Sequence, residues 1–271
     1  MPNSTRLFPM TFSPTVEPSD TGDHGEIDMY NNYPHKISDM GYTVVASLLT
    51  VTWVSGTLLN IFSLVVFLSN KRLRSPTNMF VMSLNFCDLC MSCFGTFMAM
   101  TSSWNGRWLY GRTGCLFEGF MVYFLGMASM YLLCAISVDR YVVIAKPLLG
   151  AKINHMVAGL SIAACWIGGF MWAAFPLFGW NEYVLEGAGV SCSVVWETSN
   201  SNYTSYIFVI FVFCLVIPLA VMGFSYYGVF MTIKSMSKGR DKTSRIAKRN
   251  MKVEKKMAKT IFVMLGKLTV S

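Results

Sequence analysis

The sequence contains few charged residues for its length. Only 13% of its 271 residues are Asp, Glu, Lys or Arg, whereas 54% are hydrophobic and the mean hydropathy is +0.47. A soluble domain of this size needs a larger share of charged side chains to solvate its surface. The scarcity of charge therefore excludes an ordinary soluble domain and predicts an integral membrane protein.

Histidine is scarce as well, which bears on metal binding. The chain has three histidines, and none lies near Cys87, Cys90 and Cys93, whose spacing resembles that of metal ligands. These cysteines fall inside an apolar run, where thiols behave as small buried hydrophobic side chains. We therefore predict no metal site.

The net charge of +8 raises the alternative of a nucleic-acid-binding protein. Proteins of that class gather their basic residues into one patch or domain. In this chain Lys and Arg fall between apolar runs instead. We therefore expect no nucleic-acid partner.

Five apolar runs are long enough to cross a bilayer as helices, and a sixth begins near residue 257. The segment before them, residues 1–41, is polar and lacks the apolar core and cleavage site of a signal peptide. The predicted fold class is all-α, a transmembrane helical bundle over residues 42–271 behind an extracellular N-terminal tail. The runs lie near residues 42–68, 79–100, 115–136, 156–178 and 206–233.

The positions of Lys and Arg predict which loops face the cytoplasm, because loops rich in these residues stay there. Eleven basic residues lie between Lys234 and Lys259, and the opposite loops carry more Glu. We therefore expect a protein of the plasma membrane or a photoreceptor membrane, with its N-terminus outside.

The glycosylation triplets at Asn3 and Asn202 fall on that outer side. We expect the basic loop to contact either anionic membrane lipid or a protein partner. The other cytoplasmic basic residues are Lys71, Arg72, Arg74, Lys146 and Lys152.

The third run carries polar residues at both ends. Cys115 and Glu118 lie near its start, and Asp139-Arg140-Tyr141 ends it. As a helix, the stretch from Cys115 to Arg140 is roughly 37 Å long, about the thickness of a bilayer with its interfaces. Six of the eight cysteines lie inside apolar runs, whereas Cys115 and Cys192 both map to the outer, oxidising side. A disulfide there would tie the loop before the fifth run across the mouth of the bundle.

Five features in order on five runs resemble the signatures of the rhodopsin-like family of G-protein-coupled receptors, over residues from about 42 to 265. They are Asn60, Asp88, Cys115 with Asp139-Arg140-Tyr141, Trp166 and Pro218. Within the family the chain looks like a non-visual ciliary opsin of the encephalopsin, parietopsin or pinopsin kind. Three stretches carry this narrower resemblance, namely residues 114–120, the loop from 179 to 193, and residues 254–259.

The resemblance implies retinal as the cofactor. Glu118 matches the carboxylate that balances the positive charge of the retinal imine, and Glu186 matches a second site that serves this purpose in other opsins. The alternative for Glu118 is a carboxylate at the water interface, since an unpaired buried carboxylate costs several kcal/mol or takes up a proton. Gly126, Met127 and Tyr183 match positions that line the retinal pocket, although Gly and Met also serve in ordinary helix packing.

The resemblance also implies a switch for a heterotrimeric G protein at the cytoplasmic end. Arg140 is expected to pair with Asp139 and with Glu254 at the foot of the sixth run, so that breaking the pair frees that run to move. Asn60 and Asp88, polar groups deep in the first two runs, are expected to hydrogen-bond to each other or to water.

The end of the sequence departs from the family pattern. The family continues the sixth span through Cys-Trp-x-Pro and adds a seventh span with the retinal-bearing lysine and Asn-Pro-x-x-Tyr, none of which follows Gly266 here. Lys267 does not replace that lysine. Gly-Lys-Leu is what an exon–intron junction encodes when translated, so we expect a truncated isoform or gene model. As printed, the chain should not bind retinal covalently.

The predicted function is that of a light-activated G-protein-coupled receptor, and we expect no enzymatic activity. One alternative is a retinal photoisomerase of the retinochrome kind, which shares the fold. Another is a non-signalling fragment that pairs with other receptor protomers.

Overall fold

The computed structural model describes residues 37–196 and 199–238. Several sequence predictions fall outside this part of the chain. They concern most of the N-terminal tail with Asn3, the sixth run from residue 257, Glu254 and Lys267.

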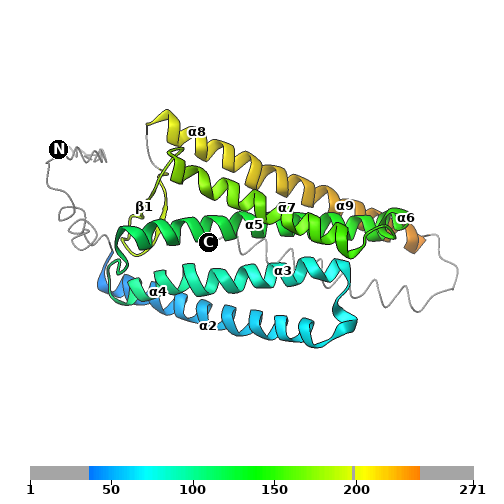
Figure 1. Cartoon of the computed structure of the whole chain (residues 1–271), viewed down its shortest axis with the longest axis horizontal. Coiled ribbons are helices and arrows are strands. Elements are labelled where there is room, and N and C mark those ends of the chain that lie inside the picture. The colour runs from blue at the N-terminus through cyan, green and yellow to red at the C-terminus, as the bar shows by residue number, and fades with distance from the viewer. Residues whose placement is uncertain (1–36, 197–198, 239–271) are drawn as a thin grey trace, which may run out of the picture.

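Five helical segments of the described chain are long and apolar enough to cross a membrane. They run side by side along the molecule, with α5 lying between α3 and α7 (Figure 1). Two of the five are interrupted by π-helical turns, named η2 and η4. The segments are α2 (Asp39–Ser69); α3 (Pro76–Met91), η2 (Ser92–Thr96) and α4 (Phe97–Trp104); α5 (Gly111–Ala145); α7 (His155–Ala174) with η3 (Phe175–Phe178); and α8 (Ser201–Ile210), η4 (Phe211–Val216) and α9 (Ile217–Lys238).

Short elements join these helices at both ends of the bundle. A two-stranded hairpin, β1 (Tyr183–Leu185) and β2 (Cys192–Val194), lies at one end. The short helix α6 (Pro147–Gly150) lies at the other end (Figure 1). Helix α5 connects the two ends of the bundle. Its first turns carry Cys115, which is bonded to the hairpin, and its last turns carry Asp139-Arg140-Tyr141, close to α6 in the chain.

Polar side chains fix where three of the long helices begin. Ser38, Ser75 and Asn154 each accept a hydrogen bond from a backbone N–H in the first turn of α2, α3 and α7, respectively. Such caps satisfy donors that have no partner inside the helix. Pro76 adds to the signal at α3, since its ring presets the helical φ at a position that needs no N–H.

The π-helical turn η4 lies directly before Pro218. A proline inside a helix cannot donate to the carbonyl one turn earlier, so the backbone ahead of it rearranges. Cys214, within η4, is buried against the rest of the bundle. The proline therefore sets which side of the fifth span faces α5.

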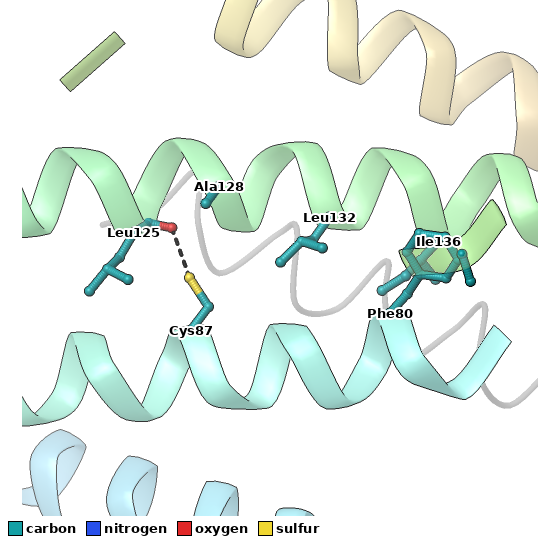
Figure 2. Packing of buried hydrophobic residues seen from close by; sticks show 7 residues of the cluster. Phe80, Cys87, Leu125, Ala128, Leu132 and Ile136 are labelled. Atoms are coloured by element: carbon teal, nitrogen blue, oxygen red, sulfur yellow. Dashed lines mark hydrogen bonds between the residues drawn. The ribbon is translucent and has the colours of Figure 1, made fainter. Parts of the chain in front are cut away.

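The main apolar core lies between α3 and α5. Figure 2 shows Phe80 and Cys87 on α3 facing Leu125, Leu132 and Ile136 on α5. The Cys87 thiol donates a hydrogen bond to the Leu125 carbonyl oxygen at 3.2 Å. Cys87 is a buried thiol, and no group of metal-ligating side chains occurs in the described part of the chain.

The helices α5 and α7 approach each other at a glycine. A Cβ atom added to Gly169 would lie 2.7 Å from the Ala128 nitrogen and 2.9 Å from the Phe124 carbonyl oxygen, both on the α5 backbone. Small residues permit such contact in membrane bundles, where close packing drives association between helices. Trp166, nearby on α7, donates to the Ser83 hydroxyl at 2.8 Å and ties α7 to α3.

This crossing predicts that Gly169→Ala destabilises the bundle. The added methyl group meets backbone atoms that cannot rotate away, so we expect a loss of about 1 to 3 kcal/mol, typical of overpacking. The measurement is the thermal unfolding midpoint of the full chain in detergent. Gly159→Ala on the same helix is the control, because its Cβ would meet no atom within 4 Å. Equal midpoints for the two variants would contradict the close crossing.

Candidate functional site

The loop between α7 and α8 folds into a hairpin over the N-terminal end of α5. Strands β1 and β2 pair antiparallel, with Leu185 opposite Cys192. Asn181 stabilises the entry to the hairpin, since its side-chain oxygen accepts hydrogen bonds from the backbone N–H groups of Glu182 at 2.7 Å and Val195 at 2.9 Å. Tyr42 of α2 donates to the Ala188 carbonyl oxygen at 2.8 Å, so the hairpin also contacts the first helix.

A disulfide joins Cys115 of α5 to Cys192 of β2, with their Cα atoms 5.4 Å apart. Both cysteines are buried and pack with Met98 and Trp108. The pairing predicted from the outer positions of these two cysteines is confirmed. It fixes the hairpin on the end of α5.

Glu118 lies one helical turn below the disulfide and is only 2% exposed. It accepts a hydrogen bond from the backbone N–H of Cys192 at 2.7 Å. No ion pair to Glu118 is found among the residues described. The alternative of a carboxylate facing water at the interface does not fit this burial. The hairpin therefore covers a carboxylate that has one strong hydrogen bond and no neighbouring cation in this part of the chain.

Tyr183 packs directly against the α5 backbone beside Glu118. A Cβ atom on Gly119 would lie 2.6 Å from the Tyr183 ring, so the ring occupies the space that the glycine leaves. The phenol donates to the Ala173 carbonyl oxygen at 2.8 Å. Burial raises the pKa of Tyr183, which keeps the phenol a neutral donor. Tyr183 therefore joins the hairpin, α5 and α7.

Below the hairpin, an apolar cavity of about 530 Å³ lies between α5 and the fifth span. Met127 lines it together with Trp196 of the loop and Cys214 of η4. Gly126 and Tyr183 do not line this cavity, although Tyr183 and Met127 belong to one packed cluster. A Cβ on Gly126 would meet no atom within 4 Å. The structure thus brings Met127, Tyr183 and Glu118 to the same half of α5 and leaves Gly126 beside open space.

Glu186 lies at the turn of the hairpin and is exposed. Its carboxylate accepts a hydrogen bond from the Ser191 hydroxyl at 2.8 Å. It is near enough to Glu118 for the two like charges to repel each other. Of the two candidate carboxylates, Glu118 is therefore buried and Glu186 faces the surroundings.

Sequence reasoning missed the aromatic residues that surround this region. Tyr123 of α5 lies with its ring centroid 5.8 Å from that of Tyr183. Tyr206 of α8 is fully buried and donates to the Trp172 carbonyl oxygen at 3.0 Å. Tyr123 follows Glu118 by five residues, which puts it about 140° away around the helix, so the spacing gave no signal for Tyr123. The position of Tyr206 depends on how α8 packs, which its own sequence does not reveal.

At the end of the bundle opposite the hairpin, the predicted switch residues lie on the last turns of α5. Asp139 is 5% exposed and accepts a hydrogen bond from the Thr77 hydroxyl of α3 at 3.3 Å. Arg140 lies near Asp139 and near Tyr226 of α9, close enough to act on both electrostatically. The expected partner Glu254 lies outside the described residues.

Tyr141 connects α5 to α9. A Cβ atom on Gly228 would lie 2.4 Å from the Tyr141 ring, and Phe224 meets the same ring edge-on at 5.8 Å between centroids. The hydroxyl of Tyr226 is buried without a hydrogen-bond partner among the described residues. The contact between α5 and α9 at this end is thus aromatic, with one unsatisfied donor.

Asn60 and Asp88 lie half-buried on α2 and α3. Asn60 donates to the Gly56 carbonyl oxygen of its own helix at 2.9 Å. Asp88 has Ser129 of α5 as its hydrogen-bonding neighbour. No direct bond between Asn60 and Asp88 is found within the described residues. Each is instead bonded within its own helix or to α5.

The glycosylation prediction at Asn202 stays a prediction. The residue is exposed in the first turn of α8, on the same side as the hairpin. Its side-chain amide donates to the Gly179 carbonyl oxygen at 2.7 Å. Glycosylation would replace one of the two amide hydrogens and leave the other to donate this bond.

The disulfide predicts that Cys192→Ser lowers the yield of folded protein. The hairpin loses its covalent tie to α5, and removal of such a bond costs about 2 to 5 kcal/mol. The measurement is the fraction of protein that elutes as a monodisperse peak from detergent after expression in cells. Cys93→Ser is the control, since Cys93 is a free, exposed thiol. Equal yields would contradict a structural role for the bond.

Comparison with known proteins agrees with this geometry. The model of the 7 transmembrane receptor (rhodopsin family) matches residues 59–271. Pinopsin of Columba livia is 34% identical over 219 residues, which cover 81% of this chain and 62% of pinopsin. Parapinopsin of Ictalurus punctatus is 34% identical over 207 residues, which cover 75% of this chain and 59% of parapinopsin.

The similarity extends to three-dimensional structure. The crystal structure of squid rhodopsin superposes with a TM-score of 0.71 at 25% sequence identity, over 84% of this chain and 63% of that one. The chain therefore spans about three-fifths of the length of the opsins that it matches. The sequence, the transmembrane helices and the fold agree: this integral membrane protein belongs to the rhodopsin family of seven-transmembrane receptors, and it resembles the opsins within it.

Proposed function

We propose that this chain belongs to a light-sensing receptor that binds retinal and signals to a heterotrimeric G protein. One observation carries the proposal, namely the burial of Glu118 beneath the Cys192 backbone N–H. A buried carboxylate with a single hydrogen bond is costly unless it takes up a proton or a cation comes to lie beside it. An opsin has such a cation, the imine of bound retinal.

The surroundings of Glu118 fit a ligand of this kind. The cavity near Met127 is almost wholly apolar, as a polyene requires. Retinal, when bound, supplies a light-absorbing polyene with one positive charge. Glu118 would balance that charge, while Tyr183 and the hairpin exclude water from it. Glu186 is the weaker candidate for this role because it is exposed.

The lysine that carries retinal has to come from outside the described residues. The five described lysines, Lys71, Lys146, Lys152, Lys234 and Lys238, all lie toward the end of the bundle opposite the hairpin. The opsin relatives are longer than this chain. Family resemblance puts their retinal-bearing lysine in the seventh span.

The cytoplasmic end supports the proposed signalling step. Arg140 and Tyr141 lie at the interface of α5 with α9, where Tyr141 packs on Gly228. A rearrangement begun at Glu118 reaches this interface along α5, which is one continuous helix. We expect the outer hairpin to face the outside and the loops that carry Lys71, Lys146 and Lys152 to face the cytoplasm.

The proposal is tested with a chimera in which the residues after Gly266 are replaced by the remaining part of Columba livia pinopsin. With 11-cis retinal bound, illumination should increase nucleotide exchange on a G protein, and the dark sample is the control. Light-dependent release of isomerised retinal without nucleotide exchange would contradict signalling and favour a photoisomerase of the retinochrome kind.

The same chimera tests the assignment of Glu118. Glu118→Gln should move the dark absorbance from the visible to the ultraviolet, because the positive charge on the imine loses its buried partner and the proton leaves. Absorption spectra of the purified pigment measure this change. Glu182→Gln is the matched control, since Glu182 is exposed and accepts a hydrogen bond from the Tyr203 hydroxyl at 3.1 Å. An ultraviolet shift in Glu186→Gln but not in Glu118→Gln would reverse the assignment.

A further inference from the structure

Two backbone carbonyl groups near the end of α7 lose their α-helical hydrogen bonds. The Trp172 carbonyl would accept from the N–H of residue 176, but Pro176 has none. The Ala173 carbonyl would accept from Leu177, but Leu177 lies in the 3₁₀ turn η3, where each N–H bonds three residues back. Both carbonyls belong to a membrane span, so their donors have to come from neighbouring protein groups.

Two buried tyrosines supply these donors. The Tyr206 hydroxyl of α8 donates to the Trp172 carbonyl oxygen at 3.0 Å, and the Tyr183 hydroxyl of β1 donates to the Ala173 carbonyl oxygen at 2.8 Å. Tyr206 is 0% exposed and Tyr183 is 5% exposed. Pro176 and the turn that follows it thus leave two adjacent acceptors on α7, to which the hairpin and the fifth span both bond.

Tyr206 lies beside the apolar cavity below the hairpin without lining it. Its neighbours on α8, Thr204 and Ile207, do line this cavity. The Tyr206 ring packs in one buried cluster with Tyr183 and meets the Trp180 ring edge-on, with 5.5 Å between the centroids. The bond from the Tyr206 hydroxyl to α7 therefore fixes where the α8 wall of the cavity lies.

We propose that Tyr206 is a positioning residue for the ligand cavity and acts through the Trp172 carbonyl that Pro176 leaves without a backbone donor. The part of this inference that concerns the ligand rests on the proposed retinal site, whereas the part that concerns the bond does not. Without the hydroxyl, a buried carbonyl has lost its donor, which is costly. The start of α8 then shifts until water reaches that carbonyl, and the cavity wall shifts with it.

A double-mutant cycle in the retinal-free 271-residue chain tests the bond. Tyr206→Phe keeps the ring and should lower the thermal unfolding midpoint in detergent by about 3 °C, the shift expected for one buried acceptor left unpaired in a chain of this size. Pro176→Ala supplies an N–H at position 176, which makes the hydroxyl dispensable. In that background Tyr206→Phe should cost less than about 1 °C.

Equal losses in the two backgrounds, or no loss in either, would overturn the proposal. Pro176→Val, which has an N–H and a side chain of similar size, replaces Pro176→Ala if that variant does not form the Cys115–Cys192 disulfide. Tyr203→Phe is the matched control on α8, because the Tyr203 hydroxyl donates to exposed Glu182 and not to α7. A loss for Tyr203→Phe as large as that for Tyr206→Phe would also overturn the proposal.

The pinopsin chimera tests the effect on the ligand. Hydroxylamine converts the imine of bound retinal to an oxime and releases the lysine amine, so the rate at which the visible band disappears in the dark measures access to the imine. Tyr206→Phe should raise this rate at least about threefold, and adding Pro176→Ala should reverse most of the increase. The dark absorbance should stay in the visible throughout, because Glu118 is unchanged.

An unchanged hydroxylamine rate in Tyr206→Phe would overturn the positioning role, as would an increase that Pro176→Ala does not reverse. A chimera that binds no retinal would overturn the proposed function and with it the part of this inference that concerns the ligand. The cycle in the retinal-free chain would still decide whether Tyr206 replaces the donor that Pro176 lacks, so the two failures are distinguishable.

Discussion

The half of the molecule that carries the hairpin depends on one hydrogen bond, from the Cys192 backbone N–H to the buried Glu118 carboxylate. The disulfide between Cys115 and Cys192 holds the donating N–H in place. Tyr183 packs on Gly119 and so covers the α5 backbone next to Glu118. A carboxylate in such a position raises the free energy of the fold unless its charge is balanced. The cost is acceptable in a protein whose ligand brings the missing positive charge. The proposed function therefore depends on the burial of Glu118.

The helix α5 connects Glu118 with the opposite end of the bundle. It packs on α3 through an apolar core and on α7 through the close crossing at Gly169. Its last turns place Tyr141 against Gly228 of α9 and bury Asp139. A ligand at the hairpin and a partner at the opposite end of the bundle would thus act on the same helix. Linkage through one shared element makes their effects reciprocal.

Much of this arrangement could be predicted from the sequence, because hydropathy and charge act locally. The apolar runs identified the membrane helices, and the outer positions of Cys115 and Cys192 identified the disulfide. The π turns, the packing of Tyr206 and the hydrogen bond from Thr77 to Asp139 could not be predicted in this way. Each depends on atoms from helices far apart in the chain, which no local pattern specifies. Asn60 and Asp88 illustrate the same limit, since each is bonded within its own helix or to α5.

The central claim is that Glu118 acts as a negative charge at a fixed place and not through its particular shape. The most direct test replaces that charge from solution. In the pinopsin chimera carrying Glu118→Ala, added formate should enter the vacated space beneath the hairpin and restore the visible absorbance in proportion to its concentration. Neutral formamide should have no effect. A spectrum that stays visible without formate, or that formate does not change, would contradict the account.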